Sequence, residues 1–182
     1  YCFDPSQIAG VSILGKIHAG FSSGGFPVIS IEKVFAQNEQ MVSERFSLDG
    51  PSGTFQKKLP NVKIGSVSDV MFRFQILLNS WAYVAPVFPA ALADFSGSGG
   101  MVGSTRVQWS RKDTDVALAR WRPYQNKFEP CPQVLVNFMY KVFKLVPDRY
   151  AAGILLASAY TLSFDELRGE IANFTPKRKD PS

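Results

Sequence analysis

The alternation of apolar and polar residues that begins at Val70 is the feature that most constrains how this chain can fold. Five apolar residues occupy every second position of this stretch: Val70, Phe72, Phe74, Ile76 and Leu78. The other face holds Met71, Arg73, Gln75, Leu77 and Asn79. Successive side chains of a β-strand point to opposite faces of a sheet, so this period of two predicts a half-buried strand.

The same period recurs toward the C-terminus, in short segments separated by turn signals. Met101 to Arg111 and Val116 to Trp121 both alternate, and the turn residues Lys112 to Asp115 between them predict a hairpin. Later segments that fit strands are Val134 to Val146, Ala151 to Leu162 and Leu167 to Thr175. A single short helix is expected at Pro89 to Phe95, where helix formers follow a proline. Many short strands with one short helix predict an all-β sandwich or barrel.

The segment before this region has a different composition. Residues 1–68 are rich in Gly, Ser and Pro, for example over residues 20–27, and contain short apolar pieces such as Val28 to Val34. This composition is typical of an extended arm that needs a neighbour to bury its apolar residues. We therefore divide the chain into an N-terminal arm (1–68), a folded domain (69–176) and a basic C-terminal tail (177–182).

The formal charge of +5 is unevenly distributed along the chain. The excess of basic residues lies in the second half and in the tail, at Arg106, Arg111, Lys112, Arg120, Arg122, Lys127, Lys177, Arg178 and Lys179. Such clusters can contact phosphates, but without an interleaved aromatic motif they more often form a solvated surface. We expect any contact with RNA to be non-specific, and the RNA-binding residues are unknown.

Little in the sequence suggests catalysis, a cofactor or a metal. The one histidine, His18, lies in a Gly-rich segment, and Cys2 and Cys131 are far apart in the sequence with no histidine nearby. The glycines from Gly97 to Gly103 lead into a predicted strand, whereas a phosphate-binding loop opens a helix. We therefore predict no enzyme activity, no cofactor, and no catalytic, cofactor-binding or metal-binding residues. Prolines interrupt the apolar stretch Ile76 to Phe95, so no membrane-spanning helix is expected.

Two alternatives are open to a β-sandwich, and both involve sugars. A glycoside-cleaving domain needs paired carboxylates, for which the candidates are Asp113, Asp115, Asp165 and Glu166. A carbohydrate-binding domain stacks sugars on exposed aromatic rings, for which the candidates are Trp81, Trp109 and Trp121. Aspartates more often shape turns, and tryptophans more often fill a core or a subunit interface, so we favour neither alternative.

The order of several short motifs resembles that of a known family. Pro86 to Phe95 is followed by a Gly-rich step and by Gly103 to Ser110, and Gly153 to Ser163 comes farther on. This order is similar to that of the jelly-roll coat proteins of picorna-like plant viruses, the secoviruses, and closest to the smallest coat protein of the cheraviruses. The resemblance covers residues 69–176. It implies an antiparallel eight-stranded jelly-roll sandwich with strands at 69–78, 81–85, 101–111, 115–121, 133–138, 139–146, 152–162 and 167–175.

That resemblance also implies a function. The chain would be a structural coat protein, made as a polyprotein product, that self-assembles with sister coat proteins into an icosahedral capsid enclosing single-stranded RNA. Its partners would be the other coat proteins of the same virion, with no membrane involved, and it would reside in virions assembled in the host cytoplasm. Apolar and aromatic area buried at symmetry-related contacts would hold the shell together.

Overall fold

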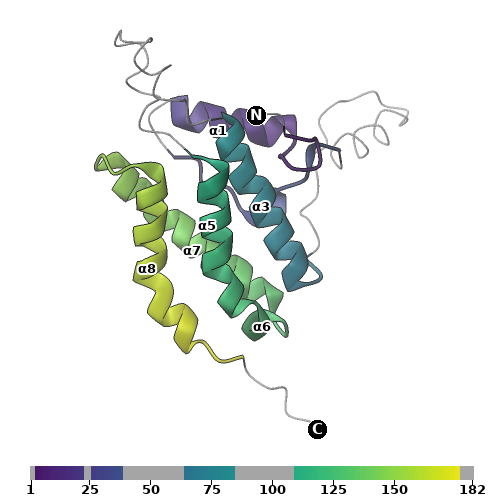
Figure 1. The fold of residues 1–182 in the computed structure, drawn as a ribbon, viewed down its shortest axis with the longest axis vertical. Coiled ribbons are helices and arrows are strands. Elements are labelled where there is room, and N and C mark those ends of the chain that lie inside the picture. Colours follow the sequence, from purple (N-terminus) through teal and green to yellow (C-terminus); the bar gives the residue numbers. More distant parts are fainter. Residues whose placement is uncertain (1–2, 23–25, 39–63, 85–108, 177–182) are drawn as a thin grey trace, which may run out of the picture.

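The computed structural model describes residues 3–22, 26–38, 64–84 and 109–176, and these residues fold mainly into helices. The long helices are α1 (Val11–Ser22), α3 (Val67–Val84), α5 (Arg111–Trp121), α7 (Pro132–Ala151) and α8 (Leu156–Asn173). Shorter elements are η1 (Ile31–Lys33), η3 (Arg122–Tyr124) and α6 (Gln125–Phe128). In Figure 1, α3, α5 and α8 lie side by side, α7 lies behind them, and α1 crosses one end of the bundle.

The prediction of an all-β jelly roll with eight strands is wrong. In the part of the chain that the structure describes, extended pairing is limited to an isolated bridge between Ala9 and Ala36. The structure places the predicted strands mostly in helices: 69–78 and most of 81–85 in α3, 115–121 in α5, 133–138 and 139–146 in α7, and most of 152–162 and 167–175 in α8. The predicted helix at Pro89 to Phe95 and most of the predicted strand 101–111 lie outside the described residues.

The alternation after Val70 was misleading because α3 is buried on nearly every side. This helix contacts α1, η1, α5 and α7. Val70, Phe74, Leu77 and Trp81 are buried at spacings of three and four residues, which is the period of a helix face. Met71 and Ile76 are buried as well. Where apolar residues occupy most positions, every second position is also apolar, so a period of two does not identify a strand.

The turn predicted at Lys112 to Asp115 is the first turn of α5. Ser110 is the N-cap residue, and its Oγ accepts a hydrogen bond from the Asp113 N–H at 3.1 Å. In return, the Asp113 carboxylate accepts a hydrogen bond from the Ser110 N–H at 2.9 Å. Such a capping box satisfies N–H groups that the start of a helix leaves without partners. The signal that we interpreted as a hairpin is therefore a helix start.

Helices α7 and α8 form an antiparallel pair joined by a short turn (Figure 1). Gly153 in this turn has a φ of 97°, a left-handed conformation that favours glycine. The N–H groups of Gly153 and Ile154 donate to the carbonyls of Tyr150 and Arg149, at 3.1 and 3.2 Å. These bonds satisfy backbone carbonyl groups in the last turn of α7. A glycine just after a helix commonly allows such bonds. Gly153 therefore ends a helix, whereas the resemblance placed it in a strand.

The described parts of residues 1–68 pack against α3. The Ala9 N–H donates a hydrogen bond to Ser80 Oγ at 2.8 Å, and Asn79 Nδ2 donates one to the Gln7 carbonyl at 3.2 Å. Ile17 and Ile31 are buried in the same hydrophobic core as α3. In contrast to the extended arm that we expected, residues 3–22 and 26–38 cover many of their apolar side chains within the chain itself.

Aromatic side chains from α3, α5 and α8 meet in the middle of this core. The ring centroids of Trp81 and Trp109 are 5.1 Å apart, and those of Trp121 and Phe164 are 5.0 Å apart. Both pairs meet edge to face, which is a favourable arrangement for aromatic rings. The expectation that the tryptophans fill a core is confirmed, although the core is helical.

Candidate functional site

A small hollow lies between α5 and α8. Its lining residues come from these two helices and from the approach to α5: Trp109, Asp113, Val116, Ala117, Arg120, Ala157, Tyr160 and Thr161. The empty space is about 210 Å³ and includes open solvent. Clefts that enclose a small-molecule ligand usually measure about 300–1,000 Å³. A few water molecules or one side chain of a partner fit the hollow better than a whole substrate.

Two of the residues that line the hollow, Trp109 and Tyr160, are aromatic, and their polar atoms are hydrogen-bonded. Tyr160 is buried, and its hydroxyl accepts a hydrogen bond from Trp121 Nε1 at 2.8 Å. Trp109 Nε1 donates a hydrogen bond to Thr114 Oγ1, also at 2.8 Å. Burial raises the pKa of Tyr160 far above its usual value, an effect that the hydrogen bond from Trp121 and the charge of Arg120 only partly offset. The hydroxyl is therefore neutral near pH 7 and is a poor general base.

The two charged residues that line the hollow have structural partners. Asp113 Oδ2 accepts hydrogen bonds from the backbone N–H and the Oγ of Ser110, both at 2.9 Å. Arg120 Nη1 lies 3.5 Å from Asp165 Oδ1, so an ion pair links α5 to α8. The guanidinium of Arg120 also lies 5.9 Å from the ring centre of Phe164. These contacts fix the start of α5 and hold α5 against α8.

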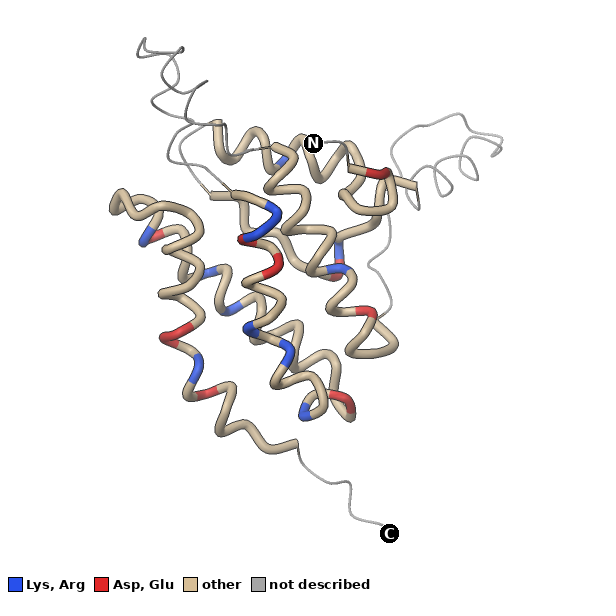
Figure 2. Tube along the Cα trace, in the orientation of Figure 1, with Lys and Arg blue, Asp and Glu red and all other residues tan. Residues whose placement is uncertain are grey.

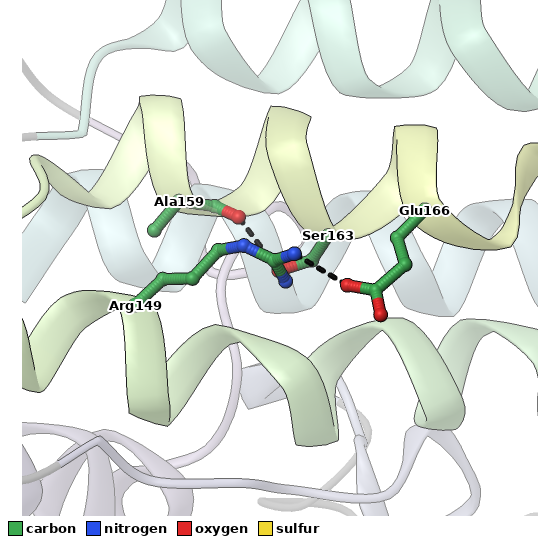
Figure 3. Close-up of polar contacts among 4 residues, drawn as sticks. All are labelled: Arg149, Ala159, Ser163 and Glu166. Carbon is green, nitrogen blue, oxygen red and sulfur yellow. Dashed lines mark hydrogen bonds and ion pairs between the residues drawn. The ribbon is translucent and has the colours of Figure 1, made fainter.

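A second polar cluster joins the end of α7 to α8 (Figure 3). Arg149 Nη1 donates a hydrogen bond to Ser163 Oγ at 3.0 Å, and Arg149 Nη2 forms an ion pair with Glu166. Ser163 is fully buried, and its hydroxyl donates a hydrogen bond to the Ala159 carbonyl at 2.7 Å. A serine nucleophile needs a neighbouring base to take its proton. This hydroxyl instead donates to the backbone of its own helix, so the cluster has the features of a structural clamp.

The four carboxylates that we considered for glycoside cleavage have separate surroundings. Asp113 caps α5, Asp165 pairs with Arg120, and Glu166 pairs with Arg149. Asp115 is exposed on α5. A glycosidase needs one carboxyl group with a raised pKa and a second one facing the same bond. The structure assigns three of these four groups to helix capping or ion pairs, which gives that alternative no support.

The three tryptophans offer no exposed ring for a sugar. Trp81 and Trp109 are 1% exposed, and Trp121 is 0% exposed. A sugar-binding platform requires ring faces that are open to solvent. The alternative of carbohydrate binding through these residues therefore has no support either.

Basic residues do not gather on one helix. In Figure 2, Lys and Arg are interspersed with Asp and Glu along α5, α7 and α8. Some of the basic residues that we noted in the sequence have structural contacts. Lys127 Nζ donates to the carbonyls of Ile171, at 2.8 Å, and Ala172 at the end of α8. The guanidinium of Arg111 lies 5.0 Å from the ring centre of Phe3.

Other basic residues lie outside such contacts or outside the described part of the chain. Lys112 and Arg122 are exposed. Arg106, Lys177, Arg178 and Lys179 are outside the described residues, as are Cys2 and the glycines from Gly97 to Gly103. His18 is exposed on α1, and Cys131 is a half-buried free thiol just before α7.

Neither a metal site nor a membrane span is found in residues 3–22, 26–38, 64–84 and 109–176. In these ranges, His, Cys, Asp and Glu side chains do not gather in threes that could hold a metal ion. Among the same residues, every helix is too short or too polar to cross a lipid bilayer.

Two pairs of large apolar side chains are exposed, one pair on α3 and the other on α8. The α3 surface consists of Phe72 and Tyr83, which are 44% and 51% exposed. The α8 surface consists of Leu155 and Leu162, which are 55% and 45% exposed. The two residues of the first pair are eleven positions apart, and those of the second pair are seven positions apart. Both spacings are close to a whole number of helical turns, so each pair lies on one side of its helix. Figure 1 shows α3 and α8 on either side of α5.

Sequence reasoning missed both surfaces because it treated these segments as strands. The signal was present as a spacing of seven residues between Leu155 and Leu162, which recurs on one face of a helix. If Gly153 had been interpreted as the end of one helix and the following segment as the next helix, the α8 surface could have been predicted. The clamp of Arg149, Ser163 and Glu166 had no comparable signal, because its members are brought together by the packing of two helices.

Comparisons with protein-family models, curated proteins and solved structures gave no match to this chain.

Proposed function

We propose that this chain is a structural protein that assembles with copies of itself. The observation that carries the proposal is the presence of two separate apolar surfaces, the α3 surface and the α8 surface, on two helices that flank α5. A subunit with one self-complementary surface forms a closed dimer, whereas two different surfaces allow repeated contacts and larger assemblies.

The energetics of these surfaces suit repeated, individually weak contacts. Burying a leucine or phenylalanine side chain completely stabilises by about 1.5–3 kcal/mol, so covering one that is already half-buried contributes roughly 1 kcal/mol. Each surface has two such side chains. One contact alone would be weak, because association also costs translational and rotational entropy. Stability would come from many contacts formed together.

The contacts inside the bundle support the same proposal. Asp113, Tyr160 and Ser163, which could in principle take part in chemistry, are engaged in a helix cap, a core hydrogen bond and a clamp. Their contacts stabilise the subunit, whereas the side chains of the two apolar surfaces remain about half exposed, although the Tyr83 ring also packs against Phe3.

Assembly is the part of the coat-protein hypothesis that does not depend on a jelly roll. Most of the strands implied by the resemblance to plant-virus coat proteins are helices, but Pro86 to Phe95 and residues 103–108 lie outside the described residues. A closed shell, enclosed RNA and sister proteins stay untested expectations, and we do not include them in the proposal.

Sedimentation of the full chain over a wide concentration range tests the proposal. We expect species heavier than the 20.1 kDa monomer, with a mean mass that rises with concentration. The variant Phe72→Glu should cap growth at small oligomers, and Phe72→Glu combined with Leu162→Glu should give a monomer. Val11→Glu is the matched control, because Val11 is 70% exposed on α1 and belongs to neither surface. A wild-type chain that stays monomeric up to millimolar concentration contradicts the proposal.

A further inference from the structure

We infer that the α8 surface is a two-fold contact, in which α8 pairs antiparallel with α8 of a second copy and the two Leu162 residues meet at the axis. This inference rests on the proposed self-assembly and names the surface and the geometry through which it occurs.

The outward side of α8 has a regular row of exposed residues. Leu155, Ser158, Leu162, Glu166 and Gly169 follow one another at spacings of three and four residues, and all five are exposed. Residues at these spacings are neighbours on one helix face. The row begins at the N-cap of α8 and extends along most of the helix.

An antiparallel two-fold pairing centred on Leu162 matches each residue with a definite partner. Residues four and seven positions before the centre meet residues four and seven positions after it, because the two helices run in opposite directions. Ser158 then lies opposite Glu166 of the second copy, and Leu155 lies opposite its Gly169. The contact uses the same face twice, as a closed dimer requires.

The partners in this pairing are complementary in size. A side-chain carbon added at Gly169 would meet no atom within 4 Å, so the space above this glycine is open. Leu155 is 55% exposed and needs such a space on the second copy. A large side chain opposite a glycine allows the two helices to approach closely.

The partners are also complementary in polarity. Arg149 engages Oε2 of Glu166, and among the described residues no partner is found for the other oxygen, Oε1. That oxygen can accept a hydrogen bond from the Ser158 hydroxyl of the second copy. A parallel pairing would instead place Glu166 beside Glu166, which is unfavourable for like charges. The charge pattern therefore selects the antiparallel arrangement.

Cysteine cross-linking of the full chain tests the geometry. The variant Leu162→Cys is prepared with Cys2→Ser and Cys131→Ser, so that one thiol is present in each chain. Facing Cα atoms of two helices whose axes lie about 9–10 Å apart are roughly 4.4–5.4 Å apart, a separation that a disulfide can bridge. We expect Leu162→Cys to form a disulfide-linked dimer rapidly on mild oxidation, and Val11→Cys, a more exposed thiol on α1, to stay unlinked.

A mixing experiment establishes the direction of the helices. Leu155→Cys and Gly169→Cys should each stay unlinked alone and should form a mixed disulfide when combined. If Leu155→Cys links to itself while Leu162→Cys does not, the antiparallel register is wrong. The matched loss-of-contact variant is Leu162→Glu, which should weaken dimer formation by about tenfold or more and keep the wild-type helix content.

The outcomes separate this inference from the proposed function. If the wild-type chain associates but Leu162→Cys does not cross-link and Leu162→Glu does not reduce the mass, self-assembly stands and uses another surface. If α8 instead captures a different protein and the pure chain stays monomeric, both the two-fold contact and the proposed self-assembly are wrong. Association together with cross-linking at residue 162 and the mixed disulfide supports both.

Discussion

Helices α3 and α8 have the same length of 18 residues but very different surroundings. In α3, 12 residues are buried, and they include Arg73, Asn79 and Ser80. In α8, six residues are buried, and the rest of the helix faces solvent or is partly covered. Helix α3 is therefore the central element on which the fold depends, whereas one side of α8 is available for contact with a second copy of the chain.

The largest expected effect concerns the centre of α3. Trp81→Ala should lower the free energy of unfolding by about 3–5 kcal/mol, because it leaves a large cavity in an aromatic cluster. Trp81 packs edge to face on Phe26, Trp109 and Phe143, and its indole N–H has no hydrogen-bond partner among the described residues, so the loss is one of packing. Urea denaturation measures the change.

The matched variant on the open side of α8 is Leu162→Ala. Its free energy of unfolding in the monomer should stay within about 0.5 kcal/mol of the wild-type value, as for most surface substitutions. Equal losses for Trp81→Ala and Leu162→Ala would refute the distinction between the two helices.

Two buried serines allow a closer comparison. Ser80 Oγ in α3 donates to the Ile76 carbonyl at 2.7 Å and accepts from the Ala9 N–H at 2.8 Å. Ser163 in α8 makes the equivalent backbone bond, but it accepts from Arg149, which also has Glu166 as a partner. Ser80→Ala leaves a buried backbone N–H without a partner and should cost about 1–3 kcal/mol. Ser163→Ala should cost about 1 kcal/mol, and thermal unfolding of both variants would rank them.

The buried side of α8 should give the fold a sensitivity to alkaline pH. The pKa of Tyr160 is raised by burial above its usual value of 10.0, so the folded chain keeps this proton when the unfolded chain loses it. The resulting contribution to stability is fully present below pH 10 and falls as the pH rises above that value.

Tyr160→Phe isolates this contribution. The variant should lose about 1 kcal/mol at neutral pH, because Trp121 Nε1 loses its acceptor. Between pH 9 and pH 11 its stability should decline less steeply than that of the wild type, and urea denaturation at several pH values measures both slopes. If the unfolding free energies of the wild type and the variant fall equally steeply with pH, a buried and neutral Tyr160 is contradicted.

A small effect of the opposite sign is expected at Gly169. Gly169→Ala should stabilise the monomer by up to about 1 kcal/mol, because alanine has the higher helix propensity and its Cβ meets open space. In the two-fold contact the same methyl group occupies space opposite Leu155, so dimer formation should weaken. Gly15→Ala on α1, where space is equally open, is the control that should stabilise without changing association. Thermal melting and sedimentation of both variants separate the two effects.

The sequence carried more helix signals than our interpretation used. Ser110 with Asp113 forms a capping box, Pro132 occupies the first turn of α7, and Gly153 follows its end. Ser110 and Gly153 were instead placed in predicted strands, and Asp113 in a turn between strands, because Asp also shapes turns. The spacing of Val70, Phe74, Leu77 and Trp81 fits a helix face as well as the alternation fits a strand. The preference of tryptophan for a core or a subunit interface did predict that these side chains are buried.

The clamp and the hollow could not have been predicted in the same way. Arg149 meets Ser163 and Glu166 because α7 packs beside α8, and Arg120 meets Asp165 because α5 packs beside α8. Such contacts follow from tertiary packing, and one sequence without a correct fold does not specify them. The α8 surface could have been predicted, because Leu155 and Leu162 are only seven positions apart and share a face once the segment is recognised as helical.

The bond from Lys127 to the end of α8 links two parts of the chain that are far apart in sequence. The last carbonyls of a helix carry partial negative charge, and here a lysine from α6 neutralises them, at Ile171 and Ala172. Opening of α6 would therefore release the final turn of α8 at the same time. The two segments should form one cooperative unit of local unfolding, with amide protons that exchange together although more than 40 residues separate them.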